Sequence, residues 1–173
     1  MPKYTLTTDE GVKIKRRQFL ICLGAVLLWI TFIFCHSLQP AAVSSSKSTY
    51  VLTLFQRFFP FGFTEHFIRK MAHFTEFGVL GVLSGALFCG CCQRLRTVFL
   101  FSVMTGMSTA LCDETIQLFV DGRSGQISDV WIDVAGTAAG AVLALSIRAV
   151  WRRREFIRRG KRHDQDTGGT GNY

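Results

Sequence analysis

The chain has 173 residues, 49% of them apolar, with sixteen Phe and only three Pro. Its mean hydropathy is positive, which argues against a water-soluble enzyme of this length. The formal charge of +8 is typical of proteins that bind nucleic acid or membrane surfaces, and of membrane proteins with basic cytoplasmic loops. Six Cys lie in or beside apolar runs without CxxC or paired Cys/His spacing, which excludes a disulfide-stapled domain and a zinc finger.

Four apolar runs are long enough to cross a membrane as helices. At about 1.5 Å per residue, roughly 20 residues span a bilayer core of about 30 Å. The runs cover residues 19–38, 71–92, 98–118 and 130–150. A basic cluster precedes the first run, as in a signal peptide, but no small-residue cleavage site follows it, so we predict a retained anchor. The sequence therefore predicts an all-α integral membrane protein, a compact bundle of four transmembrane helices.

Basic residues gather on one side of this topology. Fifteen of the twenty Lys and Arg lie before the first run, in the 93–97 connection or in the C-terminal segment. By the positive-inside rule, both termini are cytoplasmic, and the chain crosses the membrane four times. We predict a basic cytoplasmic N-terminus at 1–18, a membrane domain at 19–150, and a basic then polar cytoplasmic tail at 151–173, disordered beyond Gly160. This topology explains the charge without nucleic acid, and it leaves the oligomeric state open.

The long connection between the first two runs contains a second type of apolar segment, Val51–Phe63, interrupted by Gln56, Arg57 and Pro60. It is too short to span a bilayer. We predict an interfacial or re-entrant segment that places its phenylalanines in the headgroup boundary. These residues are Phe55, Phe58, Phe59, Phe61 and Phe63.

Polar side chains from three of the runs fall at one depth, in the outer part of the predicted bilayer. They are His73 and Glu76, then Asp113, Glu114 and Gln117, then Asp129 and Asp133. The pairs 73/76, 113/117 and 129/133 are each three or four positions apart, so the members of each pair share a helix face. An ionisable side chain inside a membrane is costly unless it is paired, which marks these residues as a candidate polar site.

Arg123 completes this candidate site, because it is the only cation in the short glycine-rich loop 120–126. A guanidinium at this position would form an ion pair with Asp121, Glu114 or Asp129, or would bind an anionic group of a ligand.

Two interpretations of the polar residues stay open, a structural hydrogen-bond network and a ligand or chemical site. For His73, a hydrogen bond to Glu76 or Asp113 is the simpler interpretation, because one His with carboxylates is a weak metal signal. We therefore predict no metal and no cofactor. The GxxxG patterns at 81–85 and 136–140 predict close helix packing rather than recognition of a partner.

Three segments carry a resemblance to a known family. They are Ser37–Pro40 with the serine-rich 44–48; Arg69–Phe77 running into Gly81; and Asp113–Phe119 followed by Gly122-Arg123, Asp129–Gly136 and Gly140. On these motifs, residues 34–145 resemble the VanZ-like family, which is named for a teicoplanin-resistance protein. The resemblance implies a multi-pass protein of the bacterial cytoplasmic membrane and, for the namesake, lowered susceptibility to teicoplanin.

The leading functional hypothesis is a non-enzymatic protein that binds an amphiphile, such as a lipoglycopeptide or a lipid-linked wall precursor, among the membrane lipids. Arg123 would meet an anionic group, Gln117 and the carboxylates would meet sugar or amide donors, and segment 51–63 would hold the acyl chain. One alternative is an intramembrane enzyme that uses His73 and the carboxylates as a metal site or as general acid and base, although no nucleophile motif, HExxH or phosphate loop is present. Another is a small proton-coupled transporter, which would require an oligomer.

Overall fold

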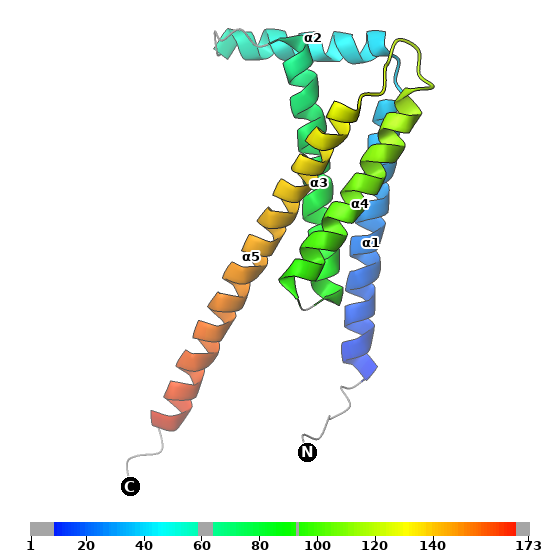
Figure 1. Cartoon of the computed structure of the whole chain (residues 1–173). Helices are drawn as coiled ribbons and strands as arrows, with labels where there is room; N and C mark the ends of the chain where they lie inside the picture. Colours follow the sequence, from blue (N-terminus) through cyan, green and yellow to red (C-terminus); the bar gives the residue numbers. More distant parts are fainter. Residues whose placement is uncertain (1–8, 59–63, 93, 169–173) are drawn as a thin grey trace.

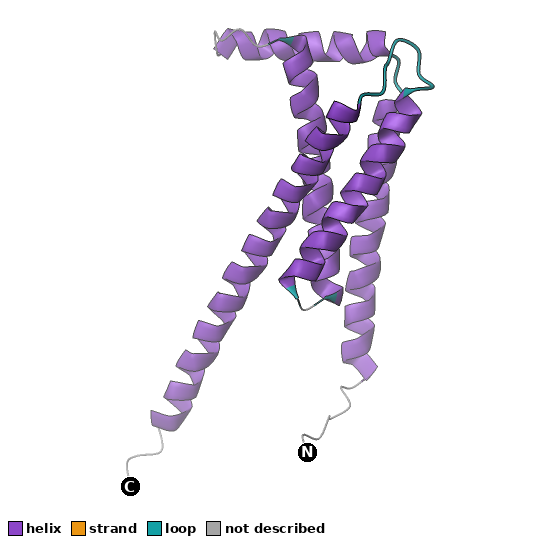
Figure 2. Cartoon of the chain, in the orientation of Figure 1, coloured by secondary structure: helices purple, strands orange, loops and turns teal. Residues whose placement is uncertain are grey.

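The computed structural model describes residues 9–58, 64–92 and 94–168, and within them it contains five α-helices and no strand. The helices are α1 (Asp9–Ser37), α2 (Ala41–Phe58), α3 (Glu65–Cys91), α4 (Leu95–Gln117) and α5 (Ile127–Gly168). Four of them run lengthwise beside one another, while α2 lies across one end of the bundle (Figure 1). The described loops, drawn in teal, lie at both ends of the bundle (Figure 2).

The four lengthwise helices are each long and apolar enough to cross a membrane, which confirms the predicted all-α class and the four spanning helices. Their apolar stretches are Arg16–Ser37, Glu65–Cys91, Leu95–Gln117 and Ile127–Arg154. Within an apolar 18-residue window of each stretch, only 11% to 33% of the residues are buried within the chain. Most of their apolar side chains therefore face outward, as lipid-facing helices require and water-facing helices avoid.

Helix α3 begins at Glu65, six residues before the predicted start at position 71. The hydroxyl of Thr64 caps it by accepting a hydrogen bond from the backbone N–H of Phe67 at 3.2 Å. The start of the apolar run and the start of the helix differ because the polar first turn is stabilised by its cap. As a result, His73 and Glu76 lie further along the helix than its first turns.

Helix α5 continues through Gly168, so the prediction of disorder beyond Gly160 is wrong for residues 161–168. Polarity alone does not end a helix. The basic run after Val150 consists largely of Arg, which is a good helix former, and no proline interrupts it.

Helix α2 begins ten residues before the predicted segment Val51–Phe63. Among its described side chains, the large apolar ones that are exposed are Val43, Tyr50, Val51 and Leu54. These positions are seven, eight and eleven residues from the first, so they form one stripe along the helix. Of the predicted headgroup phenylalanines, Phe59, Phe61 and Phe63 lie outside the described residues, as do the side chains of Phe55 and Phe58.

The closest helix pair is α3 with α5, which pack backbone against backbone at glycines. A Cβ on Gly81 would collide with the Thr137 carbonyl group, and a Cβ on Gly140 would collide with the Gly78 carbonyl oxygen. A Cβ on Gly136 would likewise meet the carbonyl oxygen of Phe74. The GxxxG patterns at 81–85 and 136–140 therefore serve packing within the chain, as predicted.

A narrow apolar core connects this pair to the other helices. Its buried members are Val26, Ile33, Phe77, Leu80, Leu87, Ala110 and Val130. Helix α4 also approaches α5 closely, because the side chain of Thr137 occupies the space that a Cβ on Gly106 would need. The four spanning helices thus form one packed unit.

The two ends of the bundle differ in chemistry. The start of α1, the α3–α4 connection and the end of α5 lie at one end, and α2 and the 118–126 loop lie at the other (Figure 1). At the first end, the Arg148 guanidinium donates a hydrogen bond to the Cys92 carbonyl oxygen at 3.2 Å. The candidate polar residues lie toward the second end, where α3 and α5 begin and α4 finishes.

Replacing Gly140 by Ala should destabilise the bundle by about 1–3 kcal/mol, because the new methyl group would push α5 away from the Gly78 backbone. The midpoint of thermal unfolding in detergent, followed by circular dichroism, measures the effect. Gly24→Ala is the matched control, since nothing lies within 4 Å of a Cβ at that position. Equal midpoints for the two variants would contradict the glycine-dependent packing.

Candidate functional site

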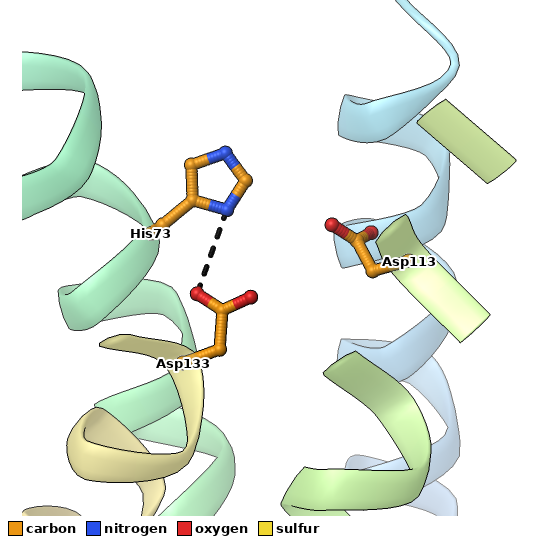
Figure 3. A group of neighbouring side chains, drawn as sticks. All are labelled: His73, Asp113 and Asp133. Atoms are coloured by element: carbon orange, nitrogen blue, oxygen red, sulfur yellow. Dashed lines mark ion pairs between the residues drawn. The ribbon is translucent and has the colours of Figure 1, made fainter. Parts of the chain in front are cut away.

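Three helices bring His73, Asp113 and Asp133 together inside the bundle, and we call these residues the His–Asp–Asp cluster. His73 comes from α3, Asp113 from α4 and Asp133 from α5, and Figure 3 shows their polar atoms turned toward one another. One side-chain nitrogen or oxygen from each residue lies within 4.8 Å of the other two. Both aspartates are 0% exposed, and the His73 side chain is 13% exposed.

The contacts within this cluster are incomplete. His73 Nδ1 lies 3.7 Å from Asp133 Oδ1, which is an ion-pair distance but too long for a hydrogen bond. Asp113 Oδ2 accepts a hydrogen bond from Gln117 Nε2 at 3.0 Å, and the Ser37 side chain of α1 also interacts with Asp113. Within the described residues, His73 Nδ1, Asp113 Oδ1 and both Asp133 carboxylate oxygens are buried without a hydrogen-bond partner. Each such atom costs about 1–3 kcal/mol.

Glu76 lies outside the cluster because it pairs with α1. Its Oε1 lies 2.9 Å from Nδ1 of His36, and Trp29 Nε1 donates a hydrogen bond to the Glu76 carbonyl oxygen at 2.9 Å. Our sequence analysis did not include His36 or Ser37 among the site residues. The signal for His36 was present, because an ionisable residue at the end of a spanning run needs a partner at the same depth.

Asp129 is also paired away from the cluster. Its Oδ1 lies 3.4 Å from Lys70 Nζ, and both side chains are partly exposed at the end of the bundle. Lys70 was part of a family motif in the sequence but was not predicted as a site residue. Its position directly before the apolar run made it a natural partner for a carboxylate at the mouth of the bundle.

Glu114 fixes the loop between α4 and α5. Its Oε2 accepts a hydrogen bond from the backbone N–H of Gln126 at 2.7 Å, and its Oε1 lies 3.5 Å from Gln117 Nε2. The same loop is tied to α2, because the Ala41 N–H donates to the Asp121 carbonyl oxygen at 3.3 Å. Gly122 takes a φ of 74°, which favours glycine. These contacts hold the loop over the mouth of the bundle.

Arg123 reaches from this loop into a cavity of about 100 Å³, which we call the polar pocket. The pocket is lined by Arg69, His73, Gln117, Gly122, Arg123, Ser124, Gln126 and Asp129. Among the described residues, Arg123 forms no ion pair within 4 Å with the carboxylates that the sequence offered as partners, which are Asp121, Glu114 and Asp129.

The other guanidinium of the pocket also lacks a carboxylate partner in the described part of the chain. Arg69 Nη2 lies 3.2 Å from Nδ1 of His66, one helical turn away. Burial lowers the pKa of the Arg123 guanidinium, while the charges of Asp113 and Glu114 act in the opposite direction. An arginine keeps its charge in such surroundings, so the pocket presents two cationic groups.

The fold and the buried polar groups define the class: this is a multi-pass membrane protein with a polar site at one end of its helical bundle. The family model described as VanZ/LLP1 matches residues 22–149, and the chain belongs to this VanZ-like family. The matched range contains all eight residues of the candidate polar site that the sequence analysis predicted. No curated protein and no solved structure gives a significant match.

Glu114→Ala should loosen the loop that closes the polar pocket, because the Gln126 N–H loses its carboxylate acceptor. A hydrogen bond to a charged group contributes about 1.5–3 kcal/mol, so amide exchange at Gln126 should rise about ten- to a hundredfold in a hydrogen-exchange experiment. Glu114→Gln keeps a carbonyl acceptor and should have a smaller effect. Unchanged exchange in the alanine variant would show that other contacts hold the loop.

Proposed function

We propose that this protein binds the anionic headgroup of a membrane amphiphile in the polar pocket. The observation that carries the proposal is the pair of guanidiniums, Arg69 and Arg123, that line the pocket without a carboxylate partner among the described residues. A guanidinium presents a rigid fork of donors that matches phosphate and carboxylate oxygens. The side chains of Gln117, Ser124 and Gln126 supply further hydrogen-bonding groups around the same space.

The volume of the pocket limits what enters it. The cavity of about 100 Å³ is small. We propose that the part of the amphiphile that enters it is a phosphate or carboxylate group. The rest of the amphiphile, whether a phospholipid, a lipid-linked wall precursor or a teicoplanin-type lipoglycopeptide, therefore lies outside the pocket. The exposed apolar stripe of α2 offers it an interfacial surface at the same end of the bundle (Figure 1).

In the proposed orientation, the polar pocket opens at the outer face of the bacterial cytoplasmic membrane, and α2 lies in the outer headgroup boundary. The support is the charge distribution, because Arg16, Arg17, Arg94, Arg96 and the arginines that follow Val150 lie at the opposite end.

This orientation predicts that green fluorescent protein fused after the C-terminus fluoresces in cells, because the fusion stays in the cytoplasm. Alkaline phosphatase inserted in the loop at Ser124 should be active, since that enzyme requires export. If the C-terminal fusion does not fluoresce and the phosphatase in the loop is inactive, the orientation in the membrane is the reverse of the one proposed. Western blotting for matched membrane levels is the control.

A second candidate function, an intramembrane enzyme, is favoured by one specific observation. His73 lines the polar pocket and also belongs to the His–Asp–Asp cluster, so a bound headgroup would lie next to buried carboxylates. Groups of this kind serve as general acid and base or as metal ligands. Chemistry would then depend on Asp113 and Asp133, whereas binding would depend on Arg69 and Arg123.

The headgroup proposal predicts that Arg123→Gln weakens amphiphile binding about ten- to a hundredfold, because a charge-assisted hydrogen bond of about 1.5–3 kcal/mol is lost. The full chain in phosphatidylcholine nanodiscs would be titrated with three probes: short-chain phosphatidylglycerol, a lipid-linked wall precursor and teicoplanin. Arg69→Gln should act in the same direction. The probe with the largest loss identifies the ligand class.

Arg96→Gln is the matched control, since Arg96 is an exposed arginine at the opposite end of the bundle. If this variant weakens binding as much as Arg123→Gln, the affinity reflects surface charge and the pocket proposal fails. If neither pocket variant changes the affinity of any probe, the proposal also fails. Selective protection of a teicoplanin-sensitive host by the wild type, abolished by Arg123→Gln, would tie the pocket to lipoglycopeptides.

A further inference from the structure

We propose that His73, Asp113 and Asp133 form a binding site for a divalent transition-metal ion of the Zn²⁺ or Mn²⁺ type. The ligand atoms are one ring nitrogen of His73 and one oxygen from each carboxylate. This site is distinct from the guanidiniums of the polar pocket, and its existence does not depend on headgroup binding.

The spacing of the three residues fits ligands around one ion better than it fits direct hydrogen bonds. His73 Nδ1 and Asp133 Oδ1 are 3.7 Å apart, whereas nitrogen–oxygen hydrogen bonds are about 2.7–3.2 Å long. Two tetrahedral ligands at about 2.0–2.2 Å from Zn²⁺ are separated by about 3.4 Å. All three ligand atoms lie within 4.8 Å of one another, so small rotations of the side chains bring them to one ion (Figure 3).

The unsatisfied polar atoms point to the same place. Within the described residues, four buried side-chain atoms lack a hydrogen-bond partner, and all four belong to this cluster. Asp133 is 0% exposed and neither of its oxygens accepts a hydrogen bond. The other buried side-chain polar atoms in the described part of the chain have partners, as in the hydrogen bond that the Thr137 hydroxyl donates to the Asp133 backbone carbonyl oxygen at 3.0 Å. When several buried nitrogen and oxygen atoms without partners gather at one place, their arrangement needs a specific explanation.

A bound cation would also balance the charge of the two carboxylates. Asp133 interacts electrostatically with four other acidic side chains, those of Asp113, Glu114, Asp129 and Glu76. Two nearby side chains are committed elsewhere, since Lys70 pairs with Asp129 and His36 pairs with Glu76. In the described part of the chain, Arg123 makes no ion pair with either aspartate of the cluster. A divalent ion would neutralise Asp113 and Asp133 together, whereas two adjacent buried carboxylates repel one another without one.

The donor set selects the class of metal. One imidazole nitrogen with two carboxylates suits Zn²⁺ or Mn²⁺, whereas Mg²⁺ and Ca²⁺ prefer oxygen alone and Cu⁺ prefers sulfur. Three protein ligands leave at least one coordination position for water or another ligand. Because His73 also lines the polar pocket, that position lies near the space where we propose the headgroup binds.

Metal content of the full chain provides the direct test. The protein would be purified in detergent with an affinity tag that contains no histidine, loaded with Zn²⁺ or Mn²⁺, and freed of unbound metal by gel filtration. Elemental mass spectrometry should then give about one equivalent for the wild type. We expect at least a tenfold lower content in His73→Gln and Asp133→Asn, because each removes a ligand while keeping a similar shape.

Asp129→Asn is the matched control, because it makes the same chemical change one helical turn from Asp133 at a residue that pairs with Lys70. This variant should keep its metal. Arg123→Gln should also keep its metal whether or not headgroup binding is lost, which separates this proposal from the preceding one. If His73→Gln and Asp133→Asn retain the wild-type metal content, the proposed ligands are wrong.

A titration of the wild type with Co²⁺ keeps the proposal testable even where a variant fails to fold. Visible absorption bands that saturate at one equivalent, and that Zn²⁺ abolishes by competition, are the expected result. Zn²⁺ should also raise the thermal midpoint of the wild type. A featureless titration, no retained metal and a higher midpoint for Asp133→Asn than for the wild type would identify a proton-sharing carboxylate network and overturn the proposal.

Discussion

The contact between the backbones of α3 and α5 determines the geometry of everything else at the polar end of the bundle. Where Gly78, Gly81, Gly136 and Gly140 meet the opposite helix, no Cβ separates the two helix backbones. The Phe74 carbonyl group lies against Gly136, so the neighbouring His73 and Asp133 are drawn to the same level. In lipid, where apolar surface gains little from helix association, such close van der Waals contact is a main source of stability.

The same geometry divides the charged residues into two groups with different roles. Glu76 pairs with His36 and Asp129 pairs with Lys70, and these pairs connect α3 to α1 and to α5 at the edge of the bundle. The cluster at the centre contains two aspartates that are 0% exposed and all four buried side-chain atoms that lack a hydrogen-bond partner among the described residues. In a purely structural network, we would expect the polar groups at the centre to have the most complete set of hydrogen bonds. The opposite arrangement favours a site that takes a further group.

The polar pocket and the His–Asp–Asp cluster share His73 but differ in charge, so we expect them to bind different groups. Guanidiniums from α3 and from the α4–α5 loop face the pocket, while carboxylates from α4 and α5 lie next to it inside the bundle. An anionic headgroup held by the arginines would be positioned beside a cation held by the carboxylates. The headgroup proposal thus depends on the arginines at this end of the molecule, and the metal proposal depends on the carboxylates beside them.

Much of this organisation follows from the sequence, because hydropathy, glycine spacing and the distribution of arginine are local properties of the chain. They predict the four spanning helices, the close approach at 81–85 and 136–140, and one depth for the acidic residues. Local patterns in the sequence did not predict the length of α5, the full extent of α2 or the pairing of the charged groups. Helix propensity and capping overrode the polarity of the residues beyond Gly160 and before Met71. Only the tertiary structure decides that Glu76 meets His36 while Asp133 meets no hydrogen-bond donor among the described residues, since partners of buried charges are set by the rotation and separation of packed helices.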